Sequence, residues 1–210
     1  MFSVALSKKL NNTELGKSGI HETYIYIPQN LDVSEIFEEP NKKIAFFCPQ
    51  NSKTYEIRLT TGREKRIVGL GPLYSDFNVN AGDEITIQKL IYGEKVVFTI
   101  KLRQFNNTVI IQKLKQGFEI LTPERLSLIG DDSYISKNGQ NIDLNLKYLS
   151  SVKKRSDSTV ETKLYDLLVD NNSLSNTYSS GTLLELSCND SKVSINKFYG
   201  WKKTVIGEDK

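Results

Sequence analysis

Residues 55–68 read YEIRLTTGREKRIV. From Tyr55 to Leu59 the side chains alternate between apolar and charged, which is typical of a strand with one buried face. Thr61 and Gly62 form a turn signal, and a second apolar stretch begins at Lys65. The segment therefore predicts a β-hairpin whose tip is crowded with charge.

Short strands of the same kind recur on both sides of this hairpin. They are expected at residues 23–27, 44–48, 84–90, 96–100 and 109–111, separated by Gly, Pro and Asn. Two short helices are expected as well, one over Val33–Phe37 capped by Asp32 or Ser34, and one over Pro72–Phe77. Regularly spaced short strands favour a barrel or a sandwich, so the chain is predicted to be mainly β with short helices.

The pattern changes after about residue 116. Strands are expected at 133–136 and 142–146, with a polar linker at 153–158 and a closing hairpin from 183–187 and 192–195. Between them, Val160, Leu164, Leu167 and Leu168 have the spacing of an amphipathic helix. We therefore expect a β-barrel-like domain over residues 1–118 and a smaller α+β region over residues 119–210.

Composition excludes several classes of protein. The 210 residues carry 28 Lys and Arg against 25 Asp and Glu, and a net charge of +3 is too small for a histone-like binder that holds nucleic acid by charge alone. Cys48 and Cys188 form no CxxC pair, and His21 is the single histidine, which argues against zinc sites and Ser/His/Asp catalysis. No phosphate-binding glycine motif is present. We expect no metal and no cofactor.

The first ten residues, MFSVALSKKL, lack the pattern of a secretory signal. No stretch approaches the 18 or so apolar residues that a membrane helix needs. The expectation is a cytoplasmic protein with no membrane partner and with reduced cysteines.

The hairpin tip is the first candidate site. Arg58, Arg63, Lys65 and Arg66 accompany Glu64, so the tip alone carries the net +3 of the whole chain. Arg and Lys can bind the guanine edge in the major groove of DNA, whereas Glu accepts a hydrogen bond from cytosine. An ordinary solvated hairpin, in which Glu64 pairs with a neighbouring cation, is the alternative that the spacing leaves open.

A second candidate precedes the first strand, in the segment LGKSGIHET at residues 15–23. Its two glycines allow a close approach of the backbone to phosphate, and Lys and Ser are common phosphate contacts. A loop without any ligand is again the alternative.

Taken together, these segments resemble the DNA-binding pseudobarrel of the EcoRII N-terminal effector domain, a fold shared with plant auxin-response transcription factors. The resemblance covers roughly residues 6–105. It rests on the loop that enters the strand ending in Ile27-Pro28, on the run Glu64-Lys65-Arg66-Ile67, and on the strand entry Gly82-Asp83-Glu84-Ile85. It implies a seven-stranded open pseudobarrel that grips the major groove with two arms.

Carried over by position, the N-arm is Lys17–Thr23 and the C-arm is Arg58–Arg66. The resemblance implies that Glu64, Lys65 and Arg66 read bases and that Lys17, Ser18, His21 and Arg58 hold the backbone; Glu22, Thr61 and Arg63 complete the expected DNA-binding set. The C-arm departs from the family in being shorter, and Gly69-Leu70-Gly71 stands where a tryptophan can follow the Glu-Lys-Arg run.

The predicted function is sequence-specific recognition of double-stranded DNA for a restriction system, with no catalytic residue in this chain. Cleavage would come from a nuclease or a nucleotide-driven motor, as in LlaJI-type systems, in another domain or subunit. The alternative is a self-contained endonuclease with a metal site in residues 120–210, where Glu161-Thr162-Lys163 forms an E-x-K motif and Asp131-Asp132 lies about thirty residues upstream. A protein-interaction barrel is a third class.

The aromatic group Phe198-Tyr199-Gly200-Trp201 either stacks bases or packs a terminal strand onto the core.

Overall fold

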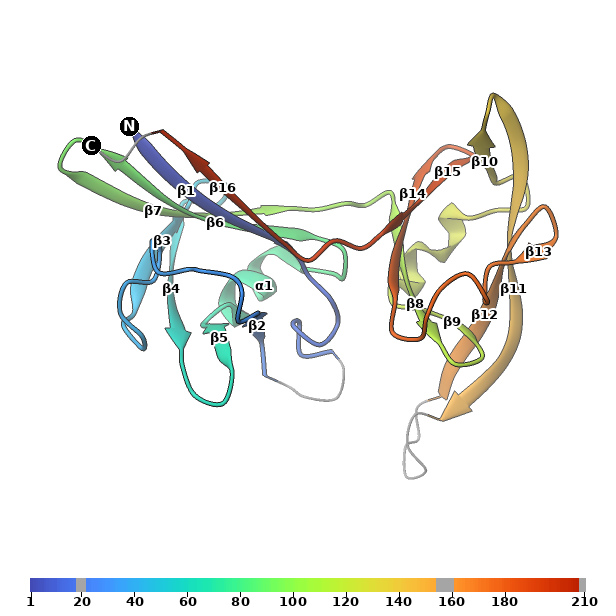
Figure 1. Cartoon of the computed structure of the whole chain (residues 1–210), viewed down its shortest axis with the longest axis horizontal. Coiled ribbons are helices and arrows are strands. Elements are labelled where there is room, and N and C mark those ends of the chain that lie inside the picture. Colours follow the sequence, from blue (N-terminus) through green and yellow to red (C-terminus); the bar gives the residue numbers. More distant parts are fainter. Residues whose placement is uncertain (18–21, 154–160, 208–210) are drawn as a thin grey trace. The chain divides into compact units, whose positions relative to one another are not determined.

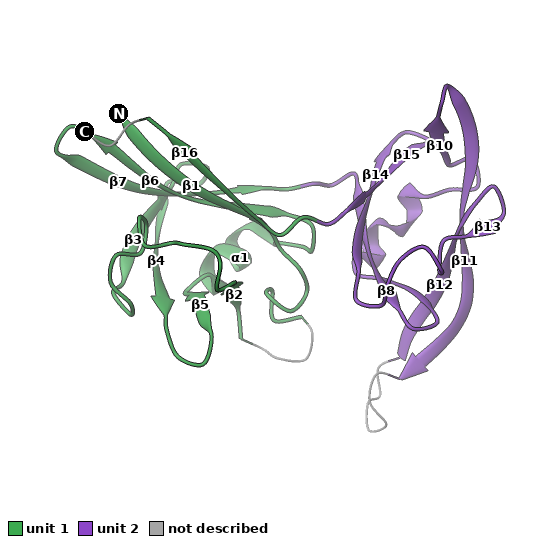
Figure 2. Ribbon diagram, in the orientation of Figure 1, with its two compact units in different colours: residues 1–104, 199–210 green, residues 105–198 purple. Residues whose placement is uncertain are grey.

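A computed structural model describes residues 1–17, 22–153 and 161–207. The chain forms two compact units: unit 1 contains Met1–Gln104 and Tyr199–Lys210, and unit 2 contains Phe105–Phe198 (Figure 2). The sequence placed the boundary at residue 118, whereas the structure divides the chain before β8 and returns the C-terminal segment to unit 1. The expected first domain therefore matches unit 1 only up to residue 104.

Unit 1 is an open sheet of eight strands, seven of which come from the first 104 residues (Figure 1). The strand order is β16-β1-β6-β7-β3-β4-β5-β2, and β3 and β7 are parallel whereas the other neighbours are antiparallel. Its elements are β1 (Phe2–Lys9), β2 (Tyr24–Ile27), β3 (Ile44–Cys48), β4 (Lys53–Thr60), β5 (Lys65–Val68), α1 (Gly71–Phe77), β6 (Glu84–Tyr92), β7 (Lys95–Arg103) and β16 (Trp201–Ile206).

The hydrophobic core of unit 1 follows from strand alternation. In β4, Tyr55, Ile57 and Leu59 are buried while Glu56 and Arg58 are exposed. Ile25 and Ile27 of β2 are buried in the same core, and they are joined by residues from β1, β3, β5, β6, β7 and α1. Since one face of each strand is buried in this way, the expected mainly β fold with an open pseudobarrel is confirmed.

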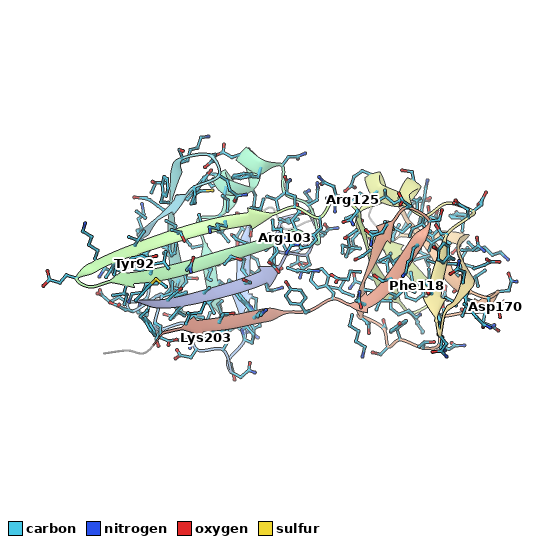
Figure 3. The ribbon with its side chains drawn as sticks, turned by 90° about the horizontal axis from the view of Figure 1, so that it is seen from above. Tyr92, Arg103, Phe118, Arg125, Asp170 and Lys203 are labelled. Atoms are coloured by element: carbon cyan, nitrogen blue, oxygen red, sulfur yellow. The ribbon has the colours of Figure 1, made fainter. Side chains whose placement is uncertain are left out.

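The two edge strands of the unit 1 sheet, β2 and β16, are linked by side chains. The indole N–H of Trp201 donates to the Tyr26 carbonyl, with an N···O distance of 3.0 Å. Lys203, labelled in Figure 3, donates to the Asp32 carbonyl at 3.2 Å and forms an ion pair with Glu35. Trp201 also packs against the core, so the aromatic group closes the sheet, as the packing alternative predicted.

A glycine fixes how β5 leaves the sheet. Gly69 has a φ of +95°, and a Cβ at this position would overlap the backbone carbonyl of Glu56. Only glycine fits both the left-handed backbone and the close approach to β4. Gly69, which begins the segment where the EcoRII-type domains can carry a tryptophan, is thus required by the local path of this chain.

Unit 2 is a sheet of eight strands in the order β11-β10-β15-β14-β8-β9-β12-β13. Seven of them close into a ring because β11 pairs with both β10 and β12, and β13 pairs with β12 outside this ring. Its core contains Val109, Ile111, Phe118, Leu167 and Leu186, among others. Its elements are β8 (Thr108–Leu114), β9 (Gly117–Ile120), the 3-10 helix η1 (Pro123–Leu128), β10 (Tyr134–Lys137), β11 (Gln140–Lys153), β12 (Glu161–Val169), β13 (Asn172–Ser173), β14 (Leu183–Asn189) and β15 (Lys192–Lys197).

Two expected helices are wrong. Residues 161–169 form the strand β12 instead of a helix. Thr162 and Leu164 are buried on one face of this strand and Leu167 is buried on the other. The apolar spacing that predicted a helix therefore comes from a strand that is covered on both faces. Residues 34–36 form a hydrogen-bonded turn, although the Asp32 carboxylate does accept a hydrogen bond from the Ser34 amide at 3.0 Å. The expected second helix is confirmed as α1. Of the expected linker, residues 154–158 lie outside the described residues.

Candidate nucleic-acid interface

The C-arm is the hairpin formed by β4 and β5. Its strands pair Arg58 with Val68, Leu59 with Ile67 and Thr60 with Arg66. Leu59 and Ile67 are buried, so alternation directs Arg58, Thr60 and Arg66 to the outer face. The hairpin that the sequence predicted is confirmed.

Strand β2 adds a third strand to this outer face. It pairs Tyr24 with Val68 and Tyr26 with Arg66. This pairing brings Glu22 of the N-arm beside Arg66 of the C-arm. More than 40 residues separate Glu22 from Arg66 in the sequence. Figure 1 shows β2 beside β5, next to the loop that joins β4 and β5.

Arg66 lies at the centre of this face and has several partners. Its Nε and Nη2 both donate to Glu64 Oε2, at 3.0 and 2.8 Å. Its guanidinium carbon lies 4.1 Å from the centre of the Tyr24 ring, in cation–π range. Glu22 Oε2 lies 3.9 Å from Nη1. The hydrogen bonds that Arg66 donates to Glu64 are the main reason that the pKa of Arg66 is raised, so the guanidinium stays charged.

Lys65 lies on the other side of the sheet from Arg66. It pairs with Ile27, a core residue, whereas Arg66 pairs with the outward-facing Tyr26. The pKa of Asp32 is lowered, mainly by hydrogen bonds from Ser34 and to a smaller extent by Lys203 and Lys65. Lys65 and Arg66, which the sequence predicted as base readers together, therefore lie on opposite faces of β5 because they are adjacent in the strand.

The tip of the C-arm forms an open hollow of about 440 Å³. It is lined by backbone and side chains of residues from both strands and the turn: Thr60, Thr61, Gly62, Arg63, Glu64 and Arg66. Thr61, Arg63 and Glu64 are exposed. Donors and an acceptor therefore share one small exposed surface.

The N-arm is anchored at its base. Lys8 and Glu14 form a buried ion pair with an N···O distance of 3.2 Å, and the Asn11 amide donates to Glu14 at 3.0 Å. Burial raises the pKa of Glu14, and Lys8 partly offsets this effect. Lys17 donates to the Val79 carbonyl at 3.0 Å and to Asn80 Oδ1 at 2.9 Å. The ammonium that was expected to hold phosphate is thus engaged within the chain.

Two expected residues of the N-arm, Ser18 and His21, lie outside the described residues. Conversely, sequence reasoning left Tyr24 and Tyr26 out of the expected site. The alternation of Tyr24-Ile25-Tyr26-Ile27 was the available signal, because buried isoleucines oblige the tyrosines to face outward.

The sequence also offers a third set of cations, whose outward alternation would extend a track for phosphate: Lys89, Lys95, Lys101, Arg103, Lys113 and Lys115. Lys89 is buried and pairs with Glu38 at 2.5 Å, and Lys113 is buried with its ammonium on the Leu114 carbonyl at 2.5 Å. Lys89 and Lys113 therefore do not contribute to an outward track for phosphate.

The E-x-K motif lies on β12 rather than on a helix. Glu161 and Lys163 are both exposed and share one face of the strand, on either side of the buried Thr162. In the described part of the chain, however, no group of three or more His, Cys, Asp or Glu side chains is arranged to hold a metal ion. The endonuclease alternative stays a prediction.

No family model matches the sequence, and no curated protein sequence matches it. Among solved structures, one match is the Arabidopsis FUS3-DNA complex, with a TM-score of 0.34 and 16% identity over 47% of this chain and 94% of that chain. No helix in the described ranges is long and apolar enough to cross a membrane.

Proposed function

We propose that unit 1 recognises double-stranded DNA by sequence, through its N-arm and C-arm in the major groove. The observation that carries this proposal is the meeting of the two arms, in which Arg66 of the C-arm and Glu22 of the N-arm come within 3.9 Å. Glu22 of the N-arm thus lies beside the three-stranded surface formed by β2, β4 and β5, which supports the proposal.

The chemistry of this surface favours a reader of bases over a general DNA coat. A protein that binds phosphate alone gains nothing from carboxylates, whereas base edges present both acceptors and donors. Arg58, Arg63 and Arg66 supply donors, and Glu22 supplies an exposed acceptor. The body of the chain is close to neutral outside the C-arm, so electrostatic attraction is concentrated where recognition takes place.

In this proposal the chain supplies specificity to a restriction system, as the resemblance to the EcoRII-type domain implies. DNA cleavage then belongs to a nuclease or a nucleotide-driven motor on another domain or subunit. Unit 2 is an accessory module or the link to that effector. Its separate hydrophobic core supports an independent role for it.

The test is a selection of bound sequences from a randomised duplex pool, using the whole chain. We expect one motif to be enriched, and the selected duplex to bind at least ~10³-fold more tightly than a scrambled duplex at physiological salt. Arg66→Ala should abolish this preference. Lys95→Ala, which removes an exposed cation from the first residue of β7, serves as the matched control and should leave it unchanged.

Equal affinity for all duplexes would refute sequence recognition. Enrichment of a motif by both the wild type and Arg66→Ala would refute the role of the two arms. Repeating the measurement at several salt concentrations separates base reading from charge attraction, because only the latter weakens steeply with salt.

A further inference from the structure

Arg66 is held in one orientation before any ligand binds. One guanidinium edge, Nε and Nη2, is bound to Glu64 at 3.0 and 2.8 Å, and one face lies 4.1 Å above the Tyr24 ring centre. An arginine fixed by a carboxylate and an aromatic ring loses less conformational entropy on binding than a mobile one. Its second edge, Nη1 and Nη2, still carries hydrogens that point away from Glu64.

The acceptor nearest to this second edge comes from the other arm. Glu22 Oε2 lies 3.9 Å from Nη1, which is longer than a hydrogen bond, and its side chain is 77% exposed. Both groups therefore retain hydrogen-bonding capacity toward a ligand that enters between them.

A G·C base pair matches this arrangement of donors and acceptor. Across the major groove it presents guanine N7 and O6 as acceptors, followed by the cytosine N4 amino group as a donor. O6 and N4 are hydrogen-bonded to each other at about 2.9 Å. Arg66 Nη1 can donate a hydrogen bond of similar length to O6, and N4 can donate another to Glu22 Oε2. The atoms Nη1, O6, N4 and Oε2 then form a four-membered arrangement in which the distance between Nη1 and Oε2 is the observed 3.9 Å.

An A·T pair does not match. Its order of groups is acceptor, donor, acceptor, so the adenine amino group would face a guanidinium N–H and the thymine oxygen would face the Glu22 carboxylate. Both contacts are repulsive or leave a buried polar group unpaired.

We propose that Arg66 and Glu22 together read one G·C base pair, with Arg66 on the guanine and Glu22 on the cytosine. Glu64 and Tyr24 are positioning residues that orient Arg66, so Glu64 is not the cytosine reader that the sequence suggested. The inference rests on the proposed function of unit 1 and names the base pair at its centre.

The experiment measures binding to the selected duplex and to a duplex in which that single G·C pair is replaced by A·T. The wild type should prefer G·C by roughly 5- to 140-fold, the range of one good bidentate contact of ~1–3 kcal/mol. Glu22→Ala should reduce this ratio severalfold. Arg66→Lys, which keeps the charge but loses the fork, should bring it close to one.

The positioning residues are tested by the same ratio together with a conservative rescue. Tyr24→Ala should lower the preference for G·C, and Tyr24→Phe should restore it, because the phenyl ring keeps the stacking surface. Glu94→Ala, which removes an exposed carboxylate from the β6–β7 turn, is the matched control and should leave the ratio at its wild-type value.

The outcomes separate the two proposals. If no motif is enriched by the wild type, the proposed function fails. If a motif is enriched but contains no G·C pair whose discrimination depends on both Arg66 and Glu22, this inference fails while sequence recognition stands. Equal affinity of every variant for a scrambled duplex at low salt checks that each remains folded.

Discussion

The contact between the two edge strands of unit 1 gives a quantitative prediction. Trp201→Phe removes the N–H that bonds to the Tyr26 carbonyl at 3.0 Å and keeps most of the packed ring. Loss of one hydrogen bond costs ~0.5–1.5 kcal/mol, and the lower half of that range applies because this bond is exposed. Trp201→Ala also removes the packing, and we expect about 2 kcal/mol, less than the ~3–5 kcal/mol of a fully buried aromatic side chain.

Urea unfolding followed by circular dichroism measures these losses. With a slope of about 2 kcal/mol per molar urea, the midpoint should fall by about 0.3–0.5 M for Trp201→Phe and about 1 M for Trp201→Ala. Hydrogen exchange followed by mass spectrometry should show faster exchange in β1 and β2. Tyr199→Phe, a change in the neighbouring aromatic residue, is the control and should shift the free energy of unfolding by less than about 0.5 kcal/mol.

Two results would refute this reasoning. Unchanged midpoints in both variants would mean that the link between β2 and β16 contributes nothing to stability. Faster exchange in β14 and β15, without a change in β2, would mean that Trp201 supports unit 2 instead of closing the sheet of unit 1.

Three further predictions concern charge, backbone and pH. Arg63→Ala should reduce the salt dependence of duplex binding by about 0.9 in the log–log slope, whereas Lys95→Ala should not change it, as titrations at several salt concentrations will show. Gly69→Ala should lower the free energy of unfolding by several kcal/mol in urea melts, and a wild-type midpoint would contradict the close approach to β4. The pKa of Asp76 is lowered from 3.8, mainly by the hydrogen bond from Tyr55 and then by the one from Lys53. The ionised Asp76 therefore stabilises the fold above pH 3.8, and this contribution disappears as the pH falls through the lowered pKa. Asp76→Asn should therefore lose less stability than the wild type between neutral and acidic pH, and parallel losses would contradict this assignment.

Much of unit 1 could be predicted from local alternation. The apolar and polar positions of residues 55–59 and 65–68 predicted β4 and β5 because each strand has one buried face. Strand β12 escaped prediction because both of its faces are partly covered, so its apolar spacing imitates a helix. The partner of β16 was not predicted, because Val205 lies opposite Val4 of β1 at the other end of the sequence.

The candidate site was predictable as a region but not in its internal geometry. The charged composition of residues 58–66 marked the C-arm, whereas the opposite orientations of Lys65 and Arg66 follow from pairing with β2. The partners of Lys17 are more than 60 residues away, so its sequence neighbours gave no sign that its ammonium is occupied. Similarly, the role of Glu64 depends on the side-chain conformation of Arg66.

The return of β16 to unit 1 has a consequence for how the chain acquires its structure during synthesis. All of unit 2 is translated between β7 and β16, so the β1 edge of the first sheet stays open until β16 has been synthesised. Pairing across about 200 residues has a very high contact order and is slow. Unit 2 has its own core and folds in the meantime, and the final step is the addition of one strand to a waiting edge. A nascent chain therefore presents an unpaired β1 edge, which is the stage at which misassociation between copies is most favoured.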